Sequence, residues 1–483
     1  MSAEANETYR YKKLKVRVWK FIAKFNGKKG FGLGDARAYL SAVTDILIVE
    51  NDYKFTEALS EALDYMEKVY RAKGHSGVAD DFKNVYKKWG ELNRDKLVAE
   101  KVLDVGRLKE ARRERDKGLT VISLFTGAFG LDLGFEYGGY TVTVALDISE
   151  DSYRNLKANR SKVPFLLGDV KNFSTSSILK EAGLRPGEAD VVTGGPPCQP
   201  FSPAGKRRSL KDPRAAPLMD FIRVIREARP KAFVMEEVPG ILSARIKHVP
   251  IKKRGQRPLS PGERPGSAWR VVIEELRKTG YNIAWKVLNA ADFGTPQTRE
   301  RVIIIGIRPD IGKPTFPSQT HTRTPITTLS GILEPWNTLA EALAKLDNKD
   351  GYTPLAPKFK KFMKYVPPGG NWRQIPDELK PNAMNEALIA GGGRMGFYRR
   401  LTWFEPSPTL VTSPSMKATM MIHPWEDRPL SVREYLRIQG FPDDWRVVFS
   451  PSKAYKLFGE AVPVQMAEAI ARTLRGVLLG CGY

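Results

Sequence analysis

The first candidate for chemistry in this sequence is a cysteine in a rigid loop. Cys198 lies within GGPPCQPFS at residues 194–202, and Cys481 is the only other cysteine of the chain. A free thiol with a pKa of about 8.5 is only about 3% ionised at pH 7, so a nucleophilic cysteine needs a positive or desolvated setting. Three prolines restrict this loop, and three basic residues at 206–208 follow it. We therefore expect a nucleophile. A buried structural cysteine would instead have apolar neighbours at a strand or helix period.

Two further stretches carry charges near expected strand ends. FVMEEVPG at 233–240 ends in carboxylates, and Glu236 can donate a proton if burial keeps it neutral. Acidic residues that begin a helix would give the same pattern. In QTRERV at 297–302, Arg299 and Arg301 alternate with the strand period and so share a face. Two surface charges explain these arginines equally well.

A glycine-rich turn, SLFTGAFGLDLGF at 123–135, follows an expected strand and would let the backbone approach a ligand closely. Asp147 ends the next expected strand, where a carboxylate can accept hydrogen bonds from ribose hydroxyls, and Asp169 follows the third. The glycine spacing is not that of a dinucleotide fingerprint, so we expect a nucleoside-bearing cofactor without a diphosphate. A tight turn with no ligand is the alternative, and a dinucleotide oxidoreductase is nearly excluded.

These residues must be positioned by the strands and helices around them. Short apolar runs alternate with amphipathic helical segments from residue 119 onward, which predicts an α/β domain with a doubly wound, mostly parallel sheet covered on both faces. Ligands in such sheets bind at the carboxyl ends of the strands. The final helix is expected to place Val462, Met466, Ile470 and Leu474 on one face. The expected strands lie within 119–125, 141–147, 163–169, 189–195, 231–237, 282–290 and 301–307.

Local composition and periodicity divide the sequence into four predicted regions. Residues 1–117 have helical periodicity and read as an accessory domain, and 118–344 hold most of the α/β domain. Residues from about 310 to 398 are rich in proline and glycine, and 345–398 form the third region, in which PPGGNWRQIP has no strand or helix period. Residues 399–483 return to the α/β domain and end in its last helix.

Composition narrows the class of function. The chain has 78 Lys and Arg against 54 Asp and Glu, a net charge of +24 and a pI of about 9.8. Such an excess favours binding to nucleic acid, although a solvated basic surface is the alternative. Two cysteines and four scattered histidines do not predict a disulfide framework or a zinc site, so no metal is expected. Without an apolar run of membrane-spanning length, we expect a cytoplasmic protein with no membrane partner.

The order and spacing of these motifs resemble those of the DNA cytosine-5 methyltransferases of restriction-modification systems. The resemblance covers about residues 119–480, and the PPCQ loop together with QTRER is its most diagnostic pair. The matching motifs run in that family's order: SLFTG, GGPPCQPFS, FVMEEVPG, QTRERV, RRLTWFEPSPTL, RPLSVREYLRIQGFP and GEAVP.

The resemblance implies a class I, Rossmann-like methyltransferase that uses S-adenosyl-L-methionine to methylate C5 of a cytosine flipped out of duplex DNA. Cys198 would attack C6, and Glu236 would donate a proton toward N3. Arg299 and Arg301 would anchor the base and the active-site carboxylate or loop. Residues 345–398 would be the target-recognition region. The residues implied at the cofactor are Phe125, Gly127, Gly130, Asp147, Ile148, Asp169, Pro197, Glu460 and Val462.

The sequence also departs from the family's usual motifs. Phe129 stands where glycine is usual, Asp147 replaces a more common Glu, and both Glu237 and Glu460 replace an Asn. Glu237 beside Glu236 would favour a protonated carboxyl if both were buried. Two alternatives therefore stay open: a tRNA cytosine-5 methyltransferase of the same catalytic family, and a catalytically impaired DNA-binding paralogue. The expected setting is a monomer at the nucleoid, with duplex DNA and a cognate restriction endonuclease as partners.

Overall fold

The structure of the 483-residue chain is a computed structural model. Two predicted features, the helical region 1–117 and the loop that begins at Cys198, lie outside the residues that it describes. The described residues are 118–197, 216–247, 257–323, 327–328, 331–343, 346, 350–388, 395–403 and 405–480.

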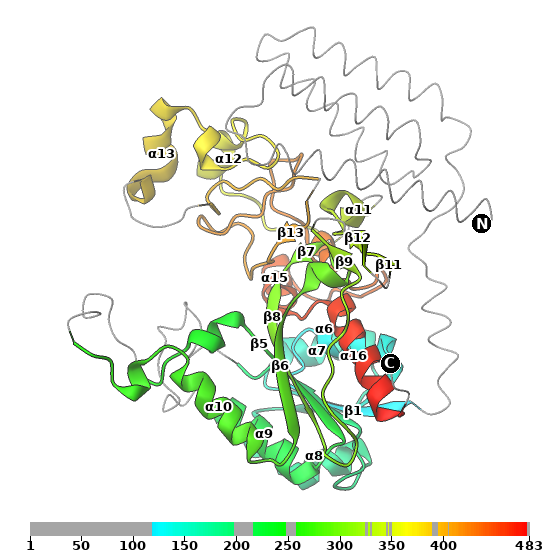
Figure 1. Ribbon diagram of the computed structural model, residues 1–483. Coiled ribbons are helices and arrows are strands. Elements are labelled where there is room, and N and C mark those ends of the chain that lie inside the picture. The colour runs from blue at the N-terminus through cyan, green and yellow to red at the C-terminus, as the bar shows by residue number, and fades with distance from the viewer. Residues whose placement is uncertain are drawn as a thin grey trace.

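A seven-stranded sheet forms the centre of the protein, in the order β3-β2-β1-β4-β5-β8-β6 (Figure 1). Strand β8 runs antiparallel to both of its neighbours, and the other neighbouring pairs are parallel. Each strand expected from the apolar runs is present, so the predicted α/β sheet is confirmed. Its strands are β1 (Leu119–Leu124), β2 (Tyr140–Asp147), β3 (Phe165–Leu167), β4 (Val191–Gly194), β5 (Ala232–Glu237), β6 (Asn282–Asn289) and β8 (Glu300–Ile307).

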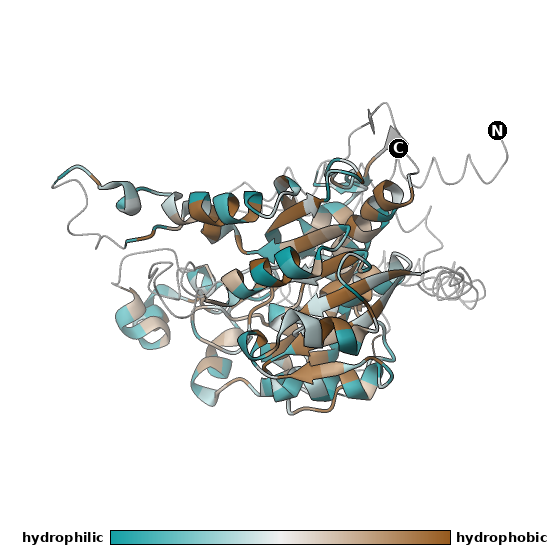
Figure 2. Ribbon diagram, turned by 90° about the horizontal axis from the view of Figure 1, so that it is seen from below, coloured by the Kyte–Doolittle hydropathy of each residue, from teal (hydrophilic) through white to brown (hydrophobic). Residues whose placement is uncertain are grey.

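Helices cover both faces of this sheet, and each layer has its own hydrophobic cluster. One face packs against α8 (Thr175–Ala182), α9 (Ala216–Ala228) and α10 (Ser267–Arg277). The other packs against α6 (Gly130–Tyr137), α7 (Glu150–Asn159) and α16 (Val464–Leu478). Figure 2 shows the resulting contrast, with apolar strands inside and polar helix faces outside. Burial of this apolar surface is the main force that holds the strand ends in place.

Helix α6 carries glycines at every fourth position, and they allow α16 to approach it closely. A Cβ atom on Gly134 would lie 2.3 Å from the Ala467 Cβ, and one on Gly138 would lie 2.5 Å from the Ala471 Cβ. The predicted apolar face of α16 is correct for Met466, Ile470 and Leu474, all of which are buried. The prediction is wrong for Val462, because Pro463 caps the helix and Val462 lies before its first turn. Val462 is nevertheless buried.

A smaller lobe carries α12 (Pro357–Met363) and α13 (Lys380–Met384), away from the sheet (Figure 1). It has a separate hydrophobic cluster that extends from Leu355 to Ile422. PPGGNWRQIP, predicted to be irregular, contains the 3-10 helix η9 (Trp372–Gln374). A capping box between Asn371 and Gln374 stabilises this single turn, which is too short to leave a periodic pattern. Assignment of 345–398 to target recognition stays a prediction.

The remaining described elements are short. They are η2 (Val170–Asn172), η5 (Pro239–Ser243), η7 (Pro261–Glu263), η8 (Ala290–Phe293), β7 (Gln297–Thr298), β9 (His321–Thr322), β10 (Thr327–Thr328), β11 (Gly331–Ile332), β12 (Glu334–Pro335), α11 (Leu339–Leu343), η10 (Asp377–Leu379), η11 (Asn385–Leu388), β13 (Ser407–Pro408), α14 (Val432–Ile438) and α15 (Pro451–Glu460).

Among the described residues, no helix combines the length and the apolar character needed to cross a membrane.

Candidate active site

An ion pair lies at the carboxyl end of β5. The Arg301 Nε lies 2.6 Å from the Glu236 Oε1, and the two side chains are only 11% and 14% exposed. Because β8 runs antiparallel to β5, its first residues lie beside the last residues of β5. A second hydrogen bond, from the Arg301 Nη1 to the Glu300 carbonyl oxygen (2.7 Å), holds the guanidinium. The arrangement fixes the orientation of the Glu236 carboxyl group.

The end of β4 runs directly past this carboxyl group. A Cβ atom on Gly195 would lie 2.8 Å from the Glu236 Oε2, which is closer than real Cβ contacts allow. A Cβ on Gly194 would lie 2.8 Å from both the Leu124 carbonyl oxygen and the Phe221 ring. The two glycines therefore let the chain that leads to Cys198 pass against Glu236. Cys198 itself lies outside the described residues.

Arg299 is buried, so it is not the surface charge that the sequence allowed as an alternative. It is 2% exposed, and its Nη1 donates to the Leu410 carbonyl oxygen at 3.1 Å. Its Nε has no hydrogen-bond partner among the described residues. Burial and the nearby Arg301 charge lower the pKa of the guanidinium, whereas Glu236 and Glu460 oppose this shift. Arg299 is therefore a buried cation that interacts electrostatically with Glu236.

The turn after β1 and the end of β2 form a second group of candidate residues. The Asp147 Oδ2 accepts a hydrogen bond from the Gly127 backbone N–H, and its Oδ1 accepts one from the Ser149 N–H, both at 2.8 Å. Burial raises the pKa of Asp147, and these two N–H donors oppose the rise. Gly127 has a φ of +54°, and a Cβ there would meet only the Phe125 carbonyl oxygen, at 3.9 Å. Open space thus lies beside a carboxylate with unused acceptor capacity.

Exposed apolar side chains border this carboxylate. Ile148 is 70% exposed and Leu167 is 42% exposed, so both present apolar surface where a ring could stack. Asp169 follows β3, with its Oδ2 3.0 Å from the Lys171 Nζ. Burial raises the pKa of Asp169, but the hydrogen bonds and charge of Lys171 outweigh it and lower the pKa below its usual value. Acceptors beside an exposed apolar surface fit the ribose and adenine of a nucleoside cofactor. Pro197 is exposed at the end of the described part of the Cys198 loop.

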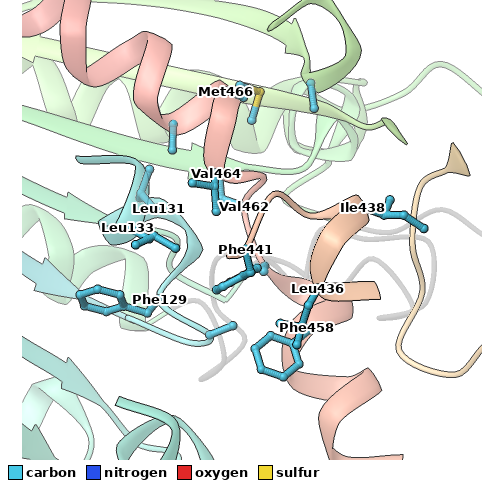
Figure 3. Close-up of a cluster of buried hydrophobic side chains, with 14 of the residues drawn as sticks. Phe129, Leu131, Leu133, Leu436, Ile438, Phe441, Phe458, Val462, Val464 and Met466 are labelled. Carbon is cyan, nitrogen blue, oxygen red and sulfur yellow. The ribbon is translucent and has the colours of Figure 1, made fainter. Parts of the chain in front are cut away.

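Phe129 adopts a left-handed conformation, with a φ of 74°, at the N-cap of α6. This conformation costs a non-glycine residue about 1 kcal/mol, which explains why glycine suits the position. The Phe129 ring is fully buried and stacks on Trp445 with 6.2 Å between ring centroids. It belongs to the apolar cluster in Figure 3, which brings together α6, α14, α15 and the segment before α16. The substitution therefore leaves the turn open.

The GEAVP segment, residues 459–463, lies on the other side of the turn after β1. A Cβ atom on Gly130 would lie 2.3 Å from the Val462 carbonyl oxygen, so the two backbones are in direct contact. Glu460 reaches the surface at the end of α15. Partial burial of its carboxyl raises its pKa and Asp147 adds to this, while Lys456 and Arg299 lower it. Glu460 therefore interacts electrostatically with both candidate groups.

Glu237 does not act on Glu236 in the way expected from the sequence. Neighbouring residues of a strand point to opposite faces, and the two carboxylates pair with successive positions of β8, Ile303 and Val302. Glu237 is 2% exposed, whereas Glu236 is partly exposed. The two carboxyl groups thus face away from each other, and the expected like-charge effect has no geometric basis.

Three buried polar residues near the site were missed from the sequence. Asp132, in the first turn of α6, accepts a hydrogen bond from the Thr193 hydroxyl at 3.3 Å, and burial raises its pKa to about 7. Gln297 and Gln439 are fully buried and hydrogen bonded to each other. Both glutamines lie inside motifs quoted above, but nothing in the sequence indicates that their side chains meet. Among the described residues, no cluster of His, Cys, Asp and Glu side chains could hold a metal ion.

The chain is similar to known proteins over most of its length. A family model described as C-5 cytosine-specific DNA methylase matches residues 119–476, which include both candidate groups. The chain belongs to this family of C-5 cytosine-specific DNA methylases. Membership makes the protein a DNA cytosine-5 methyltransferase and agrees with the resemblance seen in its motifs.

Relatives of this methylase are similar in sequence and in fold. Type II methyltransferase M.Sau96I of Staphylococcus aureus is 32% identical over 386 residues, which are 80% of this chain and 81% of that protein. Type II methyltransferase M.PspPI of Psychrobacter sp. (strain TA137) is 35% identical over 368 residues, 76% of this chain and 81% of that protein. A crystal structure described as a prophage-encoded DNA modification methyltransferase from E. coli has a TM-score of 0.50 at 24% identity. It covers 75% of this chain and 100% of that chain.

Proposed function

We propose that this methylase transfers a methyl group from S-adenosylmethionine to C5 of a cytosine flipped out of duplex DNA, through a covalent bond between Cys198 and C6. The observation that carries the proposal is the Glu236–Arg301 ion pair at the end of β5, in contact with the glycine that leads toward Cys198. An oriented carboxyl is what nucleophilic addition to a pyrimidine ring requires, because attack at C6 needs a proton at N3.

The cofactor proposal rests on the residues around Asp147. This carboxylate would accept hydrogen bonds from the ribose hydroxyls, and Ile148 would pack against the adenine ring. Asp169 would accept from the adenine amino group, while Phe125, Gly127, Gly130, Pro197, Glu460 and Val462 would border the remainder of the ligand. When bound, S-adenosylmethionine supplies an electrophilic methyl group. The glycine turn leaves room for such a ligand, since a Cβ on Gly127 would meet only the Phe125 carbonyl oxygen, at 3.9 Å.

The proposed reaction needs four residues to act together. The Cys198 thiolate forms a bond to C6, while Glu236 takes up a proton from solvent and passes it to N3, so that C5 gains electron density. Arg301 holds the Glu236 carboxyl, and Arg299 would help to anchor the base. Methyl transfer to C5 leaves S-adenosylhomocysteine; a base then removes the C5 proton, the thiolate leaves C6, and the N3 proton returns to Glu236. Extrusion of the base from the duplex costs a few kcal/mol, which contacts in the pocket must offset.

The relatives named above carry Type II methyltransferase names. We propose a restriction-modification role for this chain as well, as a monomer in the cytoplasm at the nucleoid, with a cognate endonuclease as partner. The basic composition supports a nucleic-acid substrate, since lysine and arginine release counterions from DNA phosphates.

A methyl-transfer assay tests the proposed function. The full chain is mixed with S-adenosylmethionine labelled in the methyl group, and with genomic DNA or tRNA. Label at cytosine C5 of DNA is expected, and it should disappear in Cys198→Ala. Label on tRNA alone would contradict the DNA substrate, and DNA binding without any transfer would indicate an impaired paralogue. Transfer that persists in Cys198→Ala would refute the covalent route.

A further inference from the structure

A chain of buried hydrogen bonds joins the two candidate groups. It begins at Arg299, whose Nη1 donates to the Leu410 carbonyl oxygen at 3.1 Å. The Leu410 N–H donates to the Gln297 Oε1 at 2.9 Å. The Gln297 Nε2 donates to the Gln439 Oε1 at 2.9 Å. These hydrogen bonds therefore connect Arg299, near Glu236, to Gln439 at the end of α14.

The hydrogen-bond chain ends at the GEAVP segment, which borders the cofactor turn. The Gln439 Nε2 donates to the Phe458 carbonyl oxygen at 2.7 Å and to the Ala461 carbonyl oxygen at 3.3 Å. The next residue, Val462, has its carbonyl oxygen against Gly130. The Gln439 backbone oxygen also accepts from the Val464 N–H at 2.9 Å. One glutamine thus holds both ends of the turn between α15 and α16.

The orientation of both side-chain amides follows from their partners. Leu410 offers an N–H, so the Gln297 oxygen must face it, and its NH2 group must face Gln439. Phe458 and Ala461 offer carbonyl oxygens, so the Gln439 NH2 must face them and its oxygen must face Gln297. Both glutamines are fully buried. A buried amide that loses its partner costs about 1–3 kcal/mol, so movement at one end is resisted at the other.

We propose that Gln297 and Gln439 are positioning residues that couple the cofactor site to the base site. This inference rests on the proposed function, since it assigns those two sites. The amide pair holds Arg299 and the GEAVP segment in one mutual arrangement. A ligand that orders either segment therefore favours binding at the other, and the effect must be equal in both directions.

The test measures DNA affinity with and without S-adenosylhomocysteine, and the affinity for that ligand with and without DNA. The wild-type enzyme is expected to bind each ligand more tightly when the other is present, by a factor of about ten. Gln297→Met and Gln439→Met preserve side-chain length but lose the amide. They are expected to bring this factor close to one. Gln465→Met is the matched control. The Gln465 Oε1 accepts a hydrogen bond from the hydroxyl of Thr295, two residues before Gln297, at 3.2 Å, but Gln465 is not part of the hydrogen-bond chain.

If the amide pair were merely structural, its loss in the Gln297→Met and Gln439→Met variants would lower the melting temperature without changing the coupling factor. Coupling that stays at the wild-type value in folded Gln297→Met and Gln439→Met, or that falls equally in Gln465→Met, would overturn the inference. If both variants fail to fold, hydrogen exchange on the wild-type enzyme gives an independent answer. S-adenosylhomocysteine alone should slow exchange at the Leu410 N–H, and an unchanged rate contradicts the inference. Failure of the proposed function is separate, since it shows as absent methyl transfer by the wild-type enzyme.

Discussion

Replacement of Gly195 by alanine should impair the chemical step with little effect on the fold. The new Cβ would lie 2.8 Å from the Glu236 Oε2. An ordinary contact needs about half an ångström more. The carboxyl cannot simply retreat, because the Arg301 Nε holds its other oxygen at 2.6 Å. The substitution therefore shifts the proposed proton donor.

The size of the effect follows from that displacement. A misplacement of 1 Å in an active site can cost about a hundredfold in rate, so half of it predicts a loss of about tenfold in kcat. The KM for S-adenosylmethionine should stay close to the wild-type value, because Gly195 lies beside the proton donor and not beside Asp147. Methyl transfer to duplex DNA at saturating substrate measures kcat, and a titration of the cofactor measures KM.

Two other glycines provide matched comparisons. Gly262→Ala is the control, because its Cβ would make an ordinary 3.6 Å contact with the Ile246 Cβ. Gly194→Ala should instead lower the melting temperature, because its Cβ would lie 2.8 Å from the Leu124 backbone oxygen. A Gly195→Ala enzyme with the kcat of Gly262→Ala would refute the placement of Glu236, as would a loss explained fully by unfolding.

Two further predictions follow from buried carboxyl groups. Burial raises the pKa of Asp132 from 3.8 to about 7, so stability from its protonated form is fully present below pH 4 and is lost as the pH rises through 7. The loss is about 4 kcal/mol. Asp132→Asn should therefore gain in melting temperature over the wild type between pH 4 and pH 8, and a difference independent of pH contradicts this. Asp147→Asn should weaken S-adenosylmethionine binding about 10- to 100-fold by calorimetry, because a charged acceptor is lost. Unchanged affinity would remove Asp147 from the cofactor site.

The centre of the sheet was predictable because strands such as β5 and β8 are nearly continuous apolar runs, which is what burial on both faces requires. The pairing of Glu236 with Arg301 was within reach, since both residues were candidates and Arg301 shares its expected face with Arg299. The opposite orientation of Glu237 also follows from strand alternation. Local rules thus account for the sheet and for part of the ion-pair site.

Contacts between distant segments could not be predicted in the same way. Phe129 is an unusual residue in a glycine turn, and only the fold brings it against Trp445. Gln297 and Gln439 are 142 residues apart, and no local pattern indicates that their amides meet. The short helices of the smaller lobe were missed because one or two turns leave too few residues to show a period. Local sequence patterns do not indicate which remote residues contact each other, because tertiary packing determines those contacts.

The covalent step at Cys198 can be observed directly on duplex DNA that carries 5-fluorocytosine at the target position. Fluorine at C5 cannot leave as a proton, so the proposed reaction must stop with the base still bonded to the enzyme. Intact-mass spectrometry after incubation with S-adenosylmethionine is expected to show one enzyme–DNA adduct that maps to Cys198 and is absent in Cys198→Ala. An active wild-type enzyme that forms no adduct, or an adduct that persists in Cys198→Ala, would contradict the account.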